Sequence, residues 1–153
     1  MGTPYDNIFS RFLSFIDDYD FFNLRNGESK EEFDERIEDT LNLYFQRAVA
    51  KYTNPVSDLS RDDKMQCFIN KIRPLEEEII SLMMLREYYR NKLNFLMGLK
   101  GGFSDRDWKN HDKSNKMNQY RQIIKEIEYE IKTLRNENTF SDDNGMKNNE
   151  WIG

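Results

Sequence analysis

Apolar residues that recur every three or four positions dominate this sequence, and this spacing is typical of one face of an α-helix. The longest such series lies in the C-terminal half: Met117, Tyr120, Ile124, Ile127, Ile131 and Leu134. Charged residues fill the intervals, so the pattern predicts a long helix over about 105–136 that packs along a heptad-like seam. We expect any kink or break in this helix at residues 111–114.

A second apolar stripe lies in the N-terminal segment "TPYDNIFSRFLSFIDDYDFF", residues 3–22. Thr3 is an expected N-cap, and Pro4 suits the first helical position. Charged residues interrupt the apolar run, which argues against a signal peptide, and they are mostly acidic, which disfavours a helix on an anionic membrane. We therefore expect a stripe packed mainly in the protein core. Its expected core residues are Tyr5, Ile8, Phe9, Phe12 and Ile16.

Two further helices are predicted between these segments. Asn26-Gly27 is a turn signal, and Ser29 with Glu32 forms a capping box at the start of a helix that Asn54-Pro55 stops. Pro74 opens the next helix, which runs to about Met97 and is apolar around more than half of its circumference. A helix of this kind is usually central and covered from several sides.

The remaining segments have weaker helical signals. Residues 55–73 form an irregular loop, in which only "MQCFINKI" (65–72) has strand character. The polar, asparagine-rich residues 137–153 favour an extended interaction tail that follows a single helical domain over 1–136. The predicted anchors of this tail are Phe140, Met146, Trp151 and Ile152. The expected fold class is therefore all-α: a four-helix bundle-like domain with a long C-terminal helix, the irregular loop and the extended tail.

Composition supports a folded chain, because 37% of the 153 residues are hydrophobic and 14% are aromatic, despite 33% charged residues. No run of about 18 apolar residues occurs, so we expect no membrane span. Cys67 is the single cysteine, so an internal disulfide is excluded. We expect it to be a small buried hydrophobic residue in a protein made in the cytoplasm.

The sequence carries little that indicates enzyme chemistry. The lone His111 lies among charged residues, and the aspartate pairs in "SRDDK" and "SDRDW" lack the spacing of a calcium-binding loop. "GLKGG" (98–102) is too short to cradle a phosphate. We therefore expect no catalytic, cofactor-binding or metal-binding residues, and a function other than catalysis.

Charge is distributed unevenly along the chain. Residues 1–63 contain 14 acidic and 7 basic residues, whereas residues 64–135 contain 10 acidic and 15 basic residues. Such alternation suits head-to-tail contact between copies of one protein. The expected interface or channel residues are Lys100, Arg106, Lys109, Lys113 and Lys116. The chain as a whole is acidic and lacks a recognition motif, so DNA contact is expected only as the lining of a channel.

Four stretches resemble a family of small proteins encoded among the structural genes of tailed phages that infect Gram-positive bacteria. They are "TPYDNIFSRFLSFIDDYDF", "DLSRDD" (58–63), "LEEEIISLMMLREYY" (75–89) and "FSDRDWKNHDKSNKMNQYRQI" (103–123), and they cover about half of the chain. The resemblance implies a mostly helical head–tail connector, also called a neck or adaptor protein. Such proteins form a ring, often of twelve copies, between the portal protein and the next neck or tail protein of the virion.

Two other functions remain open from the sequence. One is a cytoplasmic helical regulator that binds another protein or DNA. The other is a tail-assembly chaperone that is absent from the finished virion.

Overall fold

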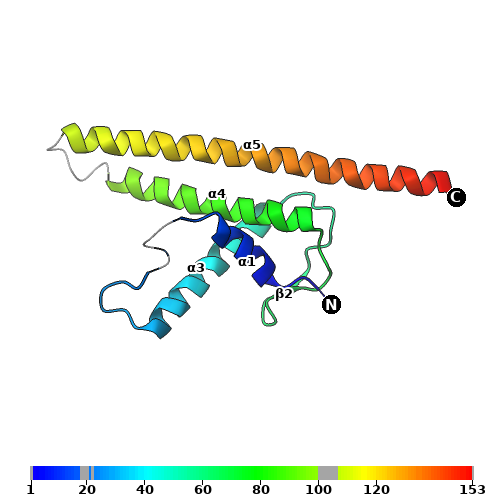
Figure 1. Cartoon of the computed structure of the whole chain (residues 1–153), viewed down its shortest axis with the longest axis horizontal. Helices are drawn as coiled ribbons and strands as arrows, with labels where there is room; N and C mark the ends of the chain where they lie inside the picture. The colour runs from blue at the N-terminus through cyan, green and yellow to red at the C-terminus, as the bar shows by residue number, and fades with distance from the viewer. Residues whose placement is uncertain (1, 18–20, 22, 100–106, 153) are drawn as a thin grey trace.

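The computed structural model contains four helices and one small sheet within the residues that it describes (Figure 1). Those residues are 2–17, 21, 23–99 and 107–152. Side chains are described for all of them except 99, 107–111 and 142–152. The fold class is all-α, as the apolar periodicity predicts.

Helix α4 (Pro74–Leu99) lies at the centre of the fold and contacts α1 (Tyr5–Ser14), α3 (Lys30–Lys51) and α5 (Asp107–Ile152). Its apolar side chains are buried on several faces: Ile79, Ile80, Leu82, Met83, Met84, Leu85 and Tyr88. A helix that is apolar around most of its circumference must be covered from several directions, and three helices cover this one. The expected central helix is therefore found, two residues longer than the sequence indicated.

Helix α1 lays its aromatic stripe against α3 and α4. The structure buries all five expected core residues, and Ile8 and Phe12 are fully enclosed. The rings of Tyr5 and Phe45 lie 4.2 Å apart, and those of Phe12 and Tyr88 lie 6.2 Å apart. Such aromatic contacts add to the stabilisation that burial itself provides. Arg11 strengthens this packing through salt bridges to Glu77 at 3.2 Å and Glu78 at 2.8 Å on α4.

The start of α3 has the predicted capping box. The Glu32 backbone N–H donates to the Ser29 hydroxyl at 3.1 Å, and the Ser29 backbone N–H donates to the Glu32 carboxylate at 3.1 Å. Just before it, Gly27 has a φ of 80°, a left-handed conformation that favours glycine. The turn at Asn26-Gly27 and the following helix start therefore both lie where the sequence indicated.

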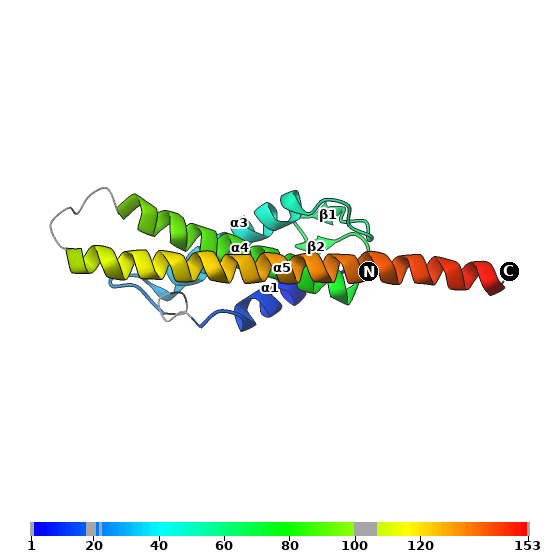
Figure 2. The same cartoon turned by 90° about the horizontal axis from the view of Figure 1, so that it is seen from above.

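Helices α4 and α5 form a long antiparallel hairpin, and Figure 2 shows α5 lying along α4 and extending beyond it. The α5 seam faces the core, because Met117, Ile124, Ile127 and Ile131 are buried. The rings of Tyr89 and Tyr120 lie 5.8 Å apart. This contact fixes the register of α5 against the C-terminal half of α4. The expected kink at residues 111–114 is absent, since α5 is one continuous helix.

The irregular segment 55–73 contains the sheet. Strand β1 (Arg61–Asp62) pairs antiparallel with β2 (Cys67–Phe68). Strand β2 lies within the stretch 65–72 that had strand character, whereas β1 precedes that stretch and was not predicted. Pro4 forms an additional bridge to Cys67, and a Cβ on Gly2 would lie 1.5 Å from the Phe68 carbonyl oxygen. The N-terminal residues therefore pack directly on β2. Cys67 on this strand is half-buried, whereas the sequence predicted a buried residue.

Thr3 does not cap α1, contrary to the sequence-based expectation. The helix has Pro4 at its N-cap, without a side-chain capping bond. Thr3 is buried, and its hydroxyl accepts a hydrogen bond from the Ile72 backbone N–H at 3.0 Å. Its carbonyl accepts another from the Phe68 N–H at 2.8 Å. A buried backbone group needs such a partner, so pairing with the 66–72 segment replaces the expected cap.

The segment expected to be an extended tail is helical, because α5 continues to Ile152. Extending an existing helix adds a backbone hydrogen bond per residue without the cost of nucleation, so the long packed part of α5 favours its own continuation. The expected anchor Phe140 is on this helix and is 66% exposed. The side chains of the other three anchors, Met146, Trp151 and Ile152, lie outside those described.

The enclosed position of Phe12 leads to a stability prediction. Phe12→Ala should lower the free energy of unfolding by about 3–5 kcal/mol, because it removes a buried ring and leaves a cavity. Urea denaturation followed by circular dichroism measures this loss. Phe140→Ala is the matched control and should change the free energy by less than about 0.5 kcal/mol. Equal losses in both variants would contradict the described packing of α1.

Candidate functional site

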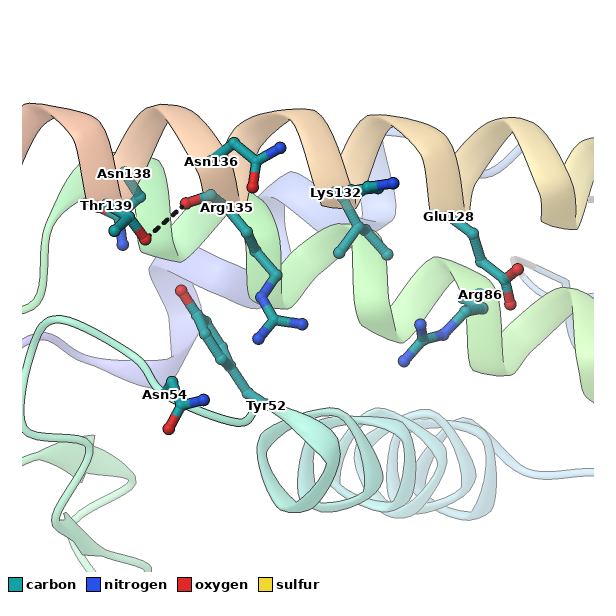
Figure 3. Close-up of a pocket in the computed structure, with 10 residues that line it drawn as sticks. Tyr52, Asn54, Arg86, Glu128, Lys132, Arg135, Asn136, Asn138 and Thr139 are labelled. Atoms are coloured by element: carbon teal, nitrogen blue, oxygen red, sulfur yellow. Dashed lines mark hydrogen bonds between the residues drawn. The ribbon is translucent and has the colours of Figure 1, made fainter.

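A pocket of about 560 Å³ lies between α5, α4 and the C-terminal end of α3 (Figure 3). Its lining residues are Tyr52, Asn54, Arg86, Glu128, Ile131, Lys132, Arg135, Asn136, Asn138 and Thr139. Three of these are cations and one is an acid. The pocket therefore combines an excess of positive charge with amide groups and an aromatic ring, and we call it the cationic pocket.

Arg86 is a partly unsatisfied cation of the pocket. It is half-buried on α4, and its Nε atom is buried without a hydrogen-bond partner among the described residues. Burial and the nearby charge of Arg90 lower the pKa of the Arg86 guanidinium, and the carboxylates of Glu128 and Glu87 offset part of this shift. Arginine nevertheless stays protonated in proteins, so a positive charge with unused donor capacity remains in the pocket.

Two of the other charged groups of the pocket, Arg135 and Glu128, have partners. Arg135 donates from Nη2 to the Thr53 carbonyl at 2.6 Å, and its guanidinium lies 5.6 Å from the centre of the Tyr52 ring. Glu128 accepts a hydrogen bond from Arg90 at 2.7 Å. Since this carboxylate already pairs with Arg90 outside the lining of the pocket, it offsets the charge of Arg86 only in part.

A buried polar network supports the floor of the pocket. The fully buried Glu76 carboxylate accepts hydrogen bonds from the Ser57 N–H at 3.0 Å and from the Tyr52 hydroxyl at 3.4 Å. Burial raises the pKa of Tyr52, and the negative charge of Glu76 raises it further. Buried polar groups with partners of this kind hold a single arrangement. The ring of Tyr52 is therefore held at the end of α3.

A second surface is an apolar groove of about 500 Å³ between α1 and α3. Its apolar lining consists of Phe9, Leu13, Phe33, Ile37 and Leu41. The acidic residues around it are Asp6, Asp34 and Glu38. A groove of this chemistry suits an apolar side chain that is flanked by basic residues. We call it the acidic groove.

A third surface is the end of the α4–α5 hairpin, which we call the hairpin tip and define by Phe95, Met97, Lys113 and Lys116. Phe95 is 68% exposed and Met97 is 49% exposed. Because the helices are antiparallel and Tyr89 contacts Tyr120, Phe95 lies at about the level of Lys113. Exposed apolar side chains and lysines thus occur together at this end of the hairpin.

The five expected interface or channel residues are only partly described. Lys113 is half-buried and Lys116 is exposed, and both lie on the first turns of α5. The side chain of Lys109 lies outside those described, and Lys100 and Arg106 lie outside the described residues altogether. The structure thus brings Lys113 and Lys116 together at the hairpin tip and leaves the other three untested.

Sequence reasoning missed the cationic pocket and the acidic groove. No pattern in the sequence shows that the Nε atom of Arg86 lacks a partner. The groove joins residues of two helices whose crossing the periodicity does not give. The sequence offers one local signal for the acidic groove, since Asp34 follows the acidic residues Glu31 and Glu32 in the first turn of α3.

Among the described residues, no three histidine, cysteine or acidic side chains are grouped so as to hold a metal ion. No helix in this part of the chain combines the length and the apolar character needed to cross a bilayer.

Comparison with known proteins gives no relative, since no family model, curated protein or solved structure matches the chain.

The contacts of Arg135 lead to a prediction about the wall of the pocket. Arg135→Gln should lower the free energy of unfolding by about 1 kcal/mol, because it removes a partly exposed charged hydrogen bond to the Thr53 carbonyl and the contact with Tyr52. Lys132→Gln removes the same charge from an exposed side chain and should change the free energy by less than about 0.5 kcal/mol. Thermal and urea denaturation measure both. Indistinguishable variants would show that Arg135 does not tie α5 to the end of α3.

Proposed function

We propose that this protein is a structural subunit of a tailed-phage virion, a head–tail connector that forms a ring between the portal protein and the tail. The role is one of assembly and not of catalysis. The observation that carries the proposal is the pairing of two unlike surfaces on one chain: the acidic groove on α1 and α3, and the basic, apolar hairpin tip on α4 and α5.

The two surfaces match in chemistry. Phe95 and Met97 offer exposed apolar side chains, and the groove offers an apolar lining of about 500 Å³. Lys116 is exposed on the tip, whereas Asp34 and Glu38 are exposed beside the groove. Insertion of the tip of one copy into the groove of the next would bury apolar surface and bring opposite charges together.

A contact between two different surfaces has a consequence for assembly. Each copy that uses its tip still has a free groove, so association is head-to-tail and continues until a ring closes or a filament forms. A closed ring is the assembly that a connector requires. The resemblance of four stretches of the sequence to phage neck proteins supports the same conclusion and names the partners, the portal protein and the next neck or tail protein.

The virion itself provides the first test. Mass spectrometry of purified particles should detect the protein in the same molar range as the portal protein. Its presence in infected cells together with its absence from finished virions would contradict the connector proposal and favour a tail-assembly chaperone.

The proposed contact is tested on the purified full-length chain by sedimentation at high protein concentration. Phe95→Asp should weaken self-association at least tenfold. The substitution places a negative charge on the apolar part of the hairpin tip, which would enter the acidic groove of the neighbouring copy. Tyr129→Asp is the matched control, since Tyr129 is 74% exposed on α5 away from the tip. A similar effect of both variants, or of neither, would contradict the tip-to-groove contact.

Charge reversal examines the same contact independently of its apolar part. Glu38→Lys should weaken association, and the double variant with Lys116→Glu should recover part of the loss. Raising salt from 50 to 500 mM shortens the Debye length from about 14 to about 4 Å and should weaken the wild-type contact. Association that is indifferent to salt and to both reversals would leave no role for the acidic residues of the groove.

A further inference from the structure

The cationic pocket contains a buried polar atom that its surroundings do not satisfy, since the Nε of Arg86 has no hydrogen-bond partner among the described residues. A guanidinium carries five N–H donors in a fixed planar arrangement that matches the oxygen atoms of carboxylates and phosphates. Leaving such a donor buried without an acceptor costs folding free energy. Groups held at such a cost are often found at binding sites.

We propose that the cationic pocket is a binding site for a phosphate group, with Arg86 as the residue that anchors it. The site does not depend on the assembly proposed above, since Arg86 is neither in the acidic groove nor in the hairpin tip. Binding requires only the phosphate group and no other part of a ligand.

The arrangement of the charged side chains supports an oxyanion. Arg86 projects from α4, and Arg135 and Lys132 come from α5 on the opposite wall (Figure 3). The guanidinium groups of Arg86 and Arg135 both point into the space between the helices and the end of α3 (Figure 3). An anion in this space would meet positive charge from two helices, and the fixed position of Tyr52 closes the pocket beneath it.

The number of cations favours phosphate over carboxylate. A carboxylate carries one negative charge, whereas a phosphate monoester or inorganic phosphate carries about 1.5 to 2 near pH 7. Glu128 and Glu87 act on Arg86 with negative charge, but Glu128 is also hydrogen-bonded to Arg90 and Glu87 to Lys51, so the cations that line the pocket are neutralised only in part. The pocket volume of about 560 Å³ also exceeds what one carboxylate fills and falls in the usual range of small-ligand sites.

Neutral groups add donors around the same space. Asn54 and Asn136 line the pocket, and each side-chain amide offers two N–H donors. Asn54 has a φ of 57°, which holds its backbone in the left-handed region at the edge of the pocket. A tetrahedral phosphate presents acceptors in several directions and uses donors from several walls, which a planar carboxylate does less completely.

The test is calorimetric titration of the full-length chain with inorganic phosphate at constant low ionic strength. Arg86→Gln should raise the dissociation constant at least about tenfold, because it removes the charged donor at the centre of the site. Lys125→Gln is the matched control: it removes one positive charge from an exposed position on α5 outside the pocket, and should change the constant less than about twofold. Acetate should bind the wild-type protein more weakly than phosphate.

A second measurement separates lost binding from lost folding. Without phosphate, Arg86→Gln should melt at about the same temperature as the wild-type protein or higher, because the variant no longer buries an Nε–H group that lacks a hydrogen-bond partner. Phosphate should raise the melting temperature of the wild-type protein and of Lys125→Gln, but not that of Arg86→Gln. Failure of phosphate to bind, or equal loss of binding in Arg86→Gln and Lys125→Gln, would overturn the proposal.

The phosphate can come from a free ion or from a nucleic-acid strand, and the two sources are distinguished with a short DNA duplex as the probe. If the strand is the source, DNA binding is lost in Arg86→Gln and kept in Lys125→Gln, and inorganic phosphate competes with the duplex. If a free phosphate is the source, inorganic phosphate binds as above, while any binding of the duplex falls equally in both variants. In both cases the site is the one that contains Arg86.

Discussion

The fold depends on the burial of the apolar surface of α4 by other parts of the chain. This helix buries side chains on several faces, and a polypeptide in water cannot leave such a surface exposed. α1, α3 and α5 each cover part of it, which explains why elements far apart in the sequence meet at one helix. The polar contacts follow the same arrangement: Arg11 joins α1 to α4 through Glu77 and Glu78, and Lys51 joins α3 to α4 through Glu87.

The irregular segment between α3 and α4 is held both by apolar burial, with Phe68 and Ile72 in the core, and by hydrogen bonds. Thr3 pairs its backbone and hydroxyl with the 66–72 segment, and Glu76 accepts hydrogen bonds from Ser57 and Tyr52. Because Glu76 belongs to α4, its hydrogen bonds tie the segment to the central helix. The same Glu76 that organises this loop also supports the floor of the cationic pocket, and this links the stability of the loop to the shape of the pocket.

The helices were predictable from the sequence because their signals are local. The periodic residues of α5 and the Ser29–Glu32 box each act within a few positions of the chain, and the structure shows both. The prediction that Thr3 caps α1 was wrong, because its hydroxyl instead accepts a hydrogen bond from Ile72, 69 residues away. The missing partner of Arg86 could not be predicted either, because it depends on how α4 and α5 cross. Local spacing thus indicates the elements, and long-range contacts determine the surfaces.

Because α5 is long, the packing of the α4–α5 hairpin determines the direction of its projecting end as well as its stability. The 46 residues of α5 form a rod of about 69 Å, at about 1.5 Å per residue. Arg73, just before α4, bonds to Asn138, so the last 14 residues of α5 extend past the central helix by about 21 Å. A tilt of about 10° at the hairpin tip would displace the far end of this rod by roughly 12 Å. Small changes in the packing of Ile127 and Ile131 would therefore cause larger displacements at the C-terminal end of α5. The core of the protein thus determines where that end of the helix lies.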